Sequence, residues 1–261
     1  MKKKLYFVYI IFAVLFLSCE EENKFDDNLT SNVDENQLIV NHFVDIVTEY
    51  YPNFGYVAPK KLNGGEVIVY FHESLSNDEK EHIRNFYDRI QFLANSVGSD
   101  ISFSYTEDSS NGFQIGIVHG DVNFLNDVFG TDYTSKETTL GKAFSSAGGG
   151  PQDCMLINKS FVFIDDERPS VLFHELGHTI GLEHTNKRGY LMTAGQLIDD
   201  VVSGVGMNEL DEMVVKLLYY VGDLGDVMVL DCAVATSYGL NNEEIEDLKN
   251  LISSIIDNDY Q

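Results

Sequence analysis

Three histidines and a glutamate between residues 174 and 184 (HELGHTIGLEH) have the types and spacing of a catalytic metal site. His174 and His178 are four residues apart, so on a helix they project from one face and can bind the same ion. Gly181 permits a sharp turn after that helix, and the turn can bring His184 back as a third nitrogen ligand. Three protein ligands leave one position open, as in catalytic zinc sites, whereas structural sites have four. The pattern therefore predicts one catalytic zinc ion.

Glu175 stands where a general base is needed. It lies about 100° round the helix from His174, too far to share the ion but within reach of a water molecule bound to it. Zinc lowers the pKa of such a water toward neutrality, and a carboxylate can then accept its proton. The alternative is that these are surface histidines without a function on an amphipathic helix. Since the eleven-residue pattern fixes five residues together, we interpret Glu175 as catalytic.

The flanking sequence predicts the elements that position this motif. Pro169 suits the first position of a helix that runs to about Leu182. Ser76 and Glu79 form a capping box for an earlier helix that follows a strand over 66–73. We expect further strands at 101–106, 113–119, 140–144 and 155–164, a helix from about 208, and an amphipathic helix over 242–256. This order predicts an α+β fold, with a five-stranded mixed sheet, the active-site helix and a C-terminal helical subdomain.

The motif, with Met192 eight residues after His184, resembles the signature of the metzincin clan of zinc endopeptidases. The short spacing is similar to that of the matrixin branch and of small bacterial metallopeptidases in the same clan. The resemblance implies a zincin-type domain that hydrolyses peptide bonds with a zinc-activated water, Glu175 passing the proton to the leaving amine. It implies that Met192 forms an apolar floor below the metal. It also implies that a peptide substrate pairs with an edge strand formed by Leu140, Gly141, Lys142 and Ala143.

Matrixins usually hold a second zinc between three histidines and one aspartate, and this sequence departs from that pattern. His119 and Asp121 match the first two ligands, but Lys142 takes the third position, and an ammonium has no free lone pair. Only Cys154 and Met155 stand where the last histidine would fall. We therefore expect one zinc per chain, with Lys142 paired to Asp121 or to a neighbouring carboxylate.

Two other groupings leave alternatives open. Asp165, Asp166 and Glu167 could contribute oxygen ligands to a Ca²⁺ ion, or they could complement the dipole of the helix that follows. Cys154 and Cys232 could form a disulfide in an oxidising compartment, or they could be two buried thiols. His42, His72 and His82 are isolated in the sequence and indicate no site.

The first residues predict export and lipidation. Three lysines precede thirteen apolar residues, 5–17, which are too few for the roughly 20 of a membrane-spanning helix. Residues 15–19, Leu-Phe-Leu-Ser-Cys, resemble a bacterial lipobox in which Cys19 becomes the lipidated first residue; a retained short anchor is the alternative. The run Glu20–Glu22 resembles an export signal of surface lipoproteins, although a solvated spacer accounts for it equally well. We expect a protein anchored by lipid to a bacterial membrane, the outer membrane, facing the periplasm or the cell surface.

The composition indicates a globular protein and excludes some partners. The 261 residues are 44% hydrophobic and 23% charged, enough apolar material for a core. The formal charge of −25 becomes −28 on loss of the three N-terminal lysines, which argues against nucleic acid and against charge-driven docking on anionic membranes. We divide the chain into a signal peptide (1–18), a tether and lead-in (19–62), a catalytic domain (63–221) and a C-terminal extension (222–261).

The sequence thus predicts a zinc endopeptidase that acts on protein or peptide substrates, and no pattern indicates its oligomeric state. The alternative is a surface binding lipoprotein that keeps the fold without turnover. Retention of the full motif disfavours it, because a decayed site need not keep Glu175.

Overall fold

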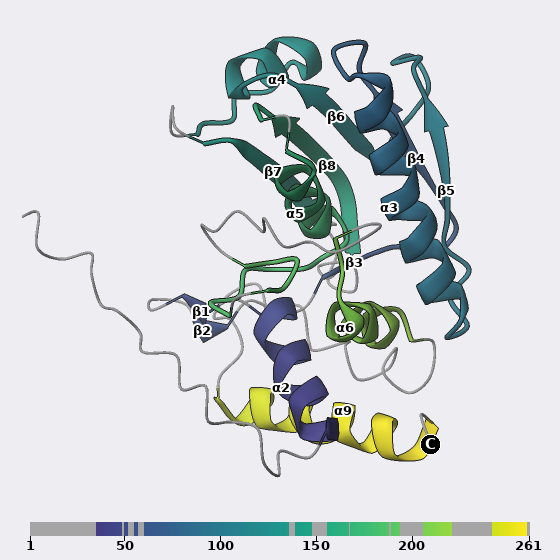
Figure 1. Ribbon diagram of the computed structural model, residues 1–261, viewed down its shortest axis with the longest axis vertical. Helices are drawn as coiled ribbons and strands as arrows, with labels where there is room; N and C mark the ends of the chain where they lie inside the picture. The colour runs from purple at the N-terminus through teal and green to yellow at the C-terminus, as the bar shows by residue number, and fades with distance from the viewer. Residues whose placement is uncertain are drawn as a thin grey trace, which may run out of the picture. The chain divides into compact units, whose positions relative to one another are not determined.

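The computed structural model describes residues 35–48, 50–51, 55–56, 60–135, 139–147, 156–166, 168–187, 189–193, 206–220 and 242–259. From Glu35 onward the chain forms one compact unit, and its described part is a mixed α/β structure with six helices (Figure 1). The strands are β1 (Tyr50–Tyr51), β2 (Gly55–Tyr56), β3 (Lys61–Leu62), β4 (Glu66–Phe71), β5 (Ser102–Thr106), β6 (Ile115–His119), β7 (Gly141–Ala147) and β8 (Leu156–Ile164). The helices are α2 (Glu35–Val47), α3 (Asn77–Asn95), α4 (Val122–Phe129), α5 (Pro169–Thr179), α6 (Glu209–Tyr219) and α9 (Asn242–Asp259).

The main sheet is mostly parallel. Strands β5, β4, β6 and β8 lie side by side in parallel, and β7 runs antiparallel along the outer side of β8. The first four residues of β6, Ile-Gly-Ile-Val, are buried on both faces, as a central parallel strand requires. The sheet has six strands rather than the expected five, because β3 pairs with the start of β8. A two-residue strand has no periodicity that a sequence pattern could reveal.

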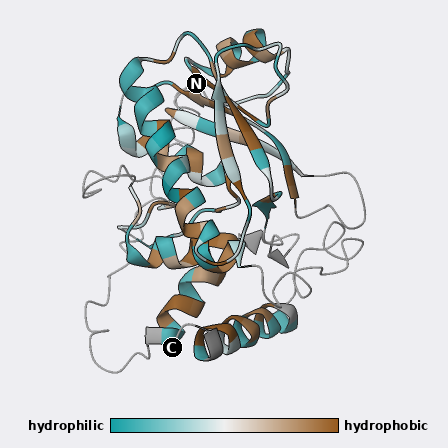
Figure 2. Cartoon of the chain, turned by 90° about the vertical axis from the view of Figure 1, so that its right-hand side faces the viewer, coloured by the Kyte–Doolittle hydropathy of each residue, from teal (hydrophilic) through white to brown (hydrophobic). Residues whose placement is uncertain are grey.

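Helices cover both faces of this sheet. On one face α3 and α5 pack together over the main core, which includes Val69, Ile117 and Val162. The capping box predicted for α3 is present, since Ser76 Oγ accepts from the Glu79 N–H and Glu79 Oε2 accepts from the Ser76 N–H. Figure 2 shows hydrophobic colour along the sheet strands and hydrophilic colour over much of α3.

The opposite face of the sheet is covered by α4, a helix that the sequence analysis missed. Leu125 of α4 is buried with Val118 and Phe163 in a second, smaller core. The Asp121 carboxylate caps the helix by accepting from the Phe124 N–H at 2.8 Å, and Gly130 ends it in a left-handed conformation. At eight residues α4 is too short for a periodicity test, although its flanking Asp and Gly are ordinary helix boundaries.

The N-terminal and C-terminal helices pack against each other. Helix α2, the first helix that the structure describes, contacts both α6 and α9, and α6 also contacts α3 (Figure 1). The Asn36 side chain donates to Asp257 Oδ1 at 2.8 Å. The apolar stripe predicted for the last helix is buried at Ile245, Leu248, Ile252, Ile255 and Ile256. The domain boundaries at 62 and 221 stay predictions.

Several predicted features lie outside the described residues. These are the signal peptide, the lipidation site Cys19, and the cysteines Cys154 and Cys232. Among the helices that the structure describes, none combines the length and the apolar character needed to cross a bilayer.

Candidate metal centre

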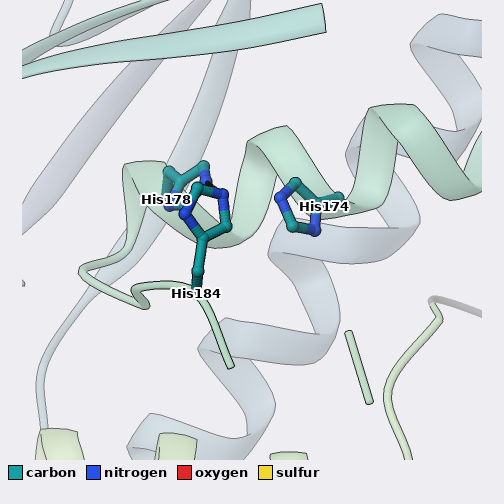
Figure 3. A group of neighbouring side chains, drawn as sticks. All are labelled: His174, His178 and His184. Atoms are coloured by element: carbon teal, nitrogen blue, oxygen red, sulfur yellow. Dashed lines mark hydrogen bonds between the residues drawn. The ribbon is translucent and has the colours of Figure 1, made fainter. Parts of the chain in front are cut away.

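Helix α5 carries the first two histidines of the motif. It begins at Pro169, as predicted, and buries Leu172, Phe173 and Leu176 in the main core. Since His174 and His178 lie one turn apart on the opposite side, the packing of α5 aims both imidazoles away from the core (Figure 3). Thr179 is the last helical residue, three residues earlier than predicted.

Gly181 makes the turn that follows. Its φ is +101°, a conformation that L side chains rarely adopt. A Cβ at this position would lie 1.8 Å from the backbone oxygen of Lys60, so the chain just before β3 passes directly against the glycine. Gly181 is therefore required both by its conformation and by this close approach, and the turn leads to His184.

The three histidines converge. The structure brings a nitrogen of His174, His178 and His184 within 4.8 Å of one another, and Figure 3 shows the three rings gathered beside α5. The Nε2 atoms of His178 and His184 are 3.2 Å apart. Among the described residues, this is the only group of three or more His, Cys, Asp or Glu side chains with such geometry.

Backbone carbonyls fix the tautomers of the two helical histidines. His174 Nδ1 lies 3.0 Å from the Leu191 oxygen, and His178 Nδ1 lies 2.8 Å from the Leu182 oxygen. Because a carbonyl oxygen can only accept, both Nδ1 atoms carry the proton. The Nε2 lone pairs of the neutral rings are then free to bind a metal ion, the usual arrangement of histidine ligands.

Burial keeps these two rings neutral. Desolvation lowers the pKa of His174 to about 4 and that of His178 to about 3, and the nearby histidines add to both shifts. At neutral pH no proton competes for the Nε2 lone pairs. Three imidazole nitrogens suit zinc among the common metal ions, so the residues present fit this ion.

Glu175 is buried beside the cluster, with 7% of its surface exposed. Burial raises the pKa of its carboxyl to about 7, and a hydrogen bond from the Ala143 backbone and the charge of Lys142 oppose that rise. A pKa close to the working pH is the property that a general base needs. Glu175 lies next to β7, because a Cβ at Gly141 would be only 3.1 Å from Glu175 Cγ.

Strand β7 contains three of the four residues predicted for the substrate edge strand. It begins at Gly141, pairs only with β8 among the described strands, and runs from Gly141 opposite Ile164 to Ala147 opposite Ile157. Leu140 directly precedes the strand, and its side chain is 39% exposed. The backbone groups on the outer side of β7 thus have no strand partner in the described structure.

Met192 lies under α5 and is fully buried. A Cβ at Gly177 would be 2.4 Å from Met192 Sδ, so α5 crosses the methionine where it has no side chain. Met192 thus packs directly against α5 at Gly177. Its role as an apolar floor below a metal ion stays a prediction.

The residues compared with a second zinc site do not gather into one. His119 Nδ1 lies 2.6 Å from Glu79 Oε1, and Asp121 caps α4. The structure shows no ion pair between Lys142 and Asp121, the first of the two expected pairings: Lys142 Nζ lies over the Phe144 ring, 5.1 Å from its centroid. The charge of Lys142 instead acts on the nearby Glu175 carboxyl, whose pKa it lowers. The pairing with a neighbouring carboxylate stays a prediction.

The acidic group before α5 is also partly engaged. Arg168 donates from Nε and from its terminal nitrogen to the two Asp166 oxygens, at 2.7 and 2.6 Å. This pairing, and a further bond from the Arg168 N–H, lower the pKa of the Asp166 carboxyl. Glu167 lies outside the described residues, and a Ca²⁺ site here has no further support.

Sequence reasoning missed the contacts that surround the cluster. His42, which the sequence left without a role, pairs with Asp211, and Asp45 accepts from the Thr185 hydroxyl. These partners are separated by 169 and 140 residues, so no local spacing could have indicated them.

Comparison with known proteins adds no family to this geometry. The sequence matches no protein-family model, and no curated protein matches it either.

Proposed function

We propose that the chain is a zinc-dependent endopeptidase of the metzincin type. The observation that carries the proposal is the convergence of His174, His178 and His184 on one point, with the buried Glu175 beside them. Zinc held by these three nitrogens would polarise a peptide carbonyl and make a water molecule acidic enough to lose a proton near neutral pH.

Glu175 supplies the proton transfer in this proposal. Its carboxylate accepts a proton from the attacking water and delivers it to the nitrogen of the leaving amine. Burial raises the pKa of this carboxyl to about 7 in the metal-free protein. The proposed role rests on the position of Glu175 beside the three histidines.

Strand β7 supplies the binding surface. The outer edge of β7 pairs with no other described strand, and an extended peptide can add to it through main-chain hydrogen bonds, which do not depend on the side chains of the peptide. At Ala143 the backbone is already hydrogen-bonded to Glu175. Gly141 and Ala143 are small and lie against α5, so a peptide on this edge lies close to Glu175. The exposed Leu140 offers an apolar contact at the start of the strand.

We further propose that the protein acts outside the cytoplasm, anchored through a lipid on Cys19. This part rests on residues 1–19 of the sequence alone.

Glu175→Gln tests the catalytic role. The variant should bind zinc as the wild type does, because Glu175 is not a ligand, while casein hydrolysis falls by at least about 10²–10⁴-fold, the range for a lost general acid or base. His178→Ala should instead lose the metal, and a chelator should abolish wild-type hydrolysis. Wild-type turnover by Glu175→Gln would refute the mechanism. Zinc binding without hydrolysis of any peptide by the wild type would favour the alternative, a binding lipoprotein on this fold.

A further inference from the structure

Helix α2 lies before the catalytic domain as the sequence delimits it, yet its hydrogen bonds lead to both loops that complete the histidine cluster. One set of bonds joins α2 directly to the loop that carries His184, and the other leads through Asp211 of α6 to Leu191 in the Leu191–Met192 turn. In each set, α2 is bonded to groups far away in the sequence.

The first set of hydrogen bonds holds both sequence neighbours of His184. The Glu183 N–H donates to the Ile46 oxygen at 2.6 Å, at the C-terminal end of α2. The Thr185 hydroxyl donates to Asp45 Oδ2 at 2.6 Å. His184 therefore sits between two residues that are each bound to α2.

The same loop is tied to the methionine turn. The Thr185 N–H donates to the Met192 oxygen at 2.8 Å, and Lys187 Nζ lies 3.3 Å from Asp45 Oδ2. Thr185 is only 2% exposed, so water competes little for the hydrogen bond between its hydroxyl and Asp45. This bond therefore holds the Thr185 side chain in one position. His184 is the most exposed of the three histidines and lacks the packing that α5 gives to the other two. The hydrogen bonds of its loop take the place of that packing.

The second set of hydrogen bonds orients His174. His42 Nε2 lies 3.1 Å from Asp211 Oδ1, and both side chains are buried. The other oxygen of Asp211 accepts from the Leu191 N–H at 3.1 Å. The carbonyl of Leu191 then accepts from His174 Nδ1, so α2 is linked to this ring through one carboxylate and one backbone residue.

From these contacts we propose that α2 is a positioning element of the metal centre, with Asp45 as its main positioning residue. Asp45 holds Thr185, and Thr185 fixes the direction in which His184 presents its nitrogen. The inference rests on the proposed zinc site and adds a residue that touches neither metal nor substrate. Partners that orient a metal ligand in this way typically contribute 10–100-fold to metal affinity or activity.

The test is a set of variants of the full chain, with zinc affinity measured by competition against a chromophoric chelator. Asp45→Ala and Thr185→Val should each weaken zinc binding about tenfold, the lower end of the range for outer partners of ligands. The double variant should lose much less than the sum of the two single losses, because both substitutions remove the bond between Thr185 and Asp45. Asn41→Ala is the matched control, since Asn41 is exposed, lies one turn earlier on α2 and bonds to Gln37.

A second comparison separates positioning from stability. Thr185→Ser keeps the hydroxyl but loses a buried methyl, so it should lower the melting temperature of the metal-free protein while zinc affinity stays at the wild-type value. Thr185→Val keeps the methyl but loses the hydroxyl, with its bond to Asp45 and the bond it accepts from the Lys187 N–H, so it should lower both the melting temperature and the zinc affinity. Thr185→Ser is therefore the variant that separates the two readouts. The visible absorption of the Co²⁺-loaded protein should change in Asp45→Ala and stay unchanged in Thr185→Ser, since it reports ligand geometry.

The possible results are distinct. Wild-type zinc affinity in both Asp45→Ala and Thr185→Val would overturn the role of α2 and leave the zinc site intact. Affinity that follows the melting temperature across all variants, Thr185→Ser included, would also overturn it. A wild-type chain that binds no zinc would overturn the proposed function, and this inference with it.

Discussion

Replacing Gly181 by Ala should damage the fold and the metal site together. A side chain at φ +101° costs about 1–2 kcal/mol, because Cβ crowds the neighbouring backbone in left-handed conformations. The added Cβ would also lie 1.8 Å from the Lys60 oxygen, which is backbone and cannot rotate away. Overpacking of this kind typically costs about 1–3 kcal/mol more, so we expect a loss of about 2–5 kcal/mol. For a domain of this size that corresponds to a fall in melting temperature of about 4–20 °C.

Gly65→Ala is the matched control for this substitution. Gly65 has a similar φ of +89°, but a Cβ there would meet no atom within 4 Å. It therefore carries the conformational cost without the collision, and it lies away from the histidine loop. Thermal unfolding of both metal-free variants, followed by zinc titration, separates the conformational cost of a side chain at positive φ from the cost of the collision with Lys60. Equal melting temperatures for the two variants, or normal zinc affinity in Gly181→Ala, would refute the account of the turn.

Four further predictions concern protons, metal and lipid. In the metal-free fold Glu175 has a pKa of about 7 instead of its usual 4.5, so the free energy of unfolding falls as the pH rises from 4.5 to 7 and the carboxyl ionises. Glu175→Gln removes this effect. Between pH 4.5 and 7 it should raise the slope of the unfolding free energy against pH by about 1.4 kcal/mol per pH unit, measured by urea denaturation. The neutral His174 and His178 act with the opposite sign, so the stability of the metal-free protein should fall as the pH drops below 6.5, where the unfolded chain takes up their protons first. Elemental analysis of dialysed protein should return one zinc per chain, and a ratio near two that falls in His119→Ala would contradict the reading of that loop. Cys19→Ala should release the protein from the membrane fraction; unchanged membrane association would mean that residues 5–17 are retained as an anchor.

Local patterns made much of the candidate site predictable. The spacing of His174 and His178, the turn at Gly181 and the start of α5 at Pro169 each depend on a few adjacent residues, and the structure has all of them. The capping box of α3 is equally local.

What escaped prediction was either too short or too distant. Strand β3 and helix α4 have two and eight residues, which is less than a period test needs. The contacts of His42 and Asp45 join residues more than a hundred positions apart, and such pairings depend on how the whole chain packs. The same applies to the close approach of Lys60 to Gly181.

The pairing of α2 with α9 has a consequence for the order in which the molecule is completed. Asn36 and Asp257 are bonded across 221 residues, so α2 obtains this partner only when α9 is present. Closing so long a loop costs conformational entropy before any contact offsets it, and such non-local contacts form slowly. A nascent chain can build the sheet with α3 and α5 while one side of α2 still lacks α9. Helix α9, which is synthesised long after α2, therefore completes the packing of α2. The support that α2 gives to the histidine loop depends in turn on a helix about two hundred residues further along the chain.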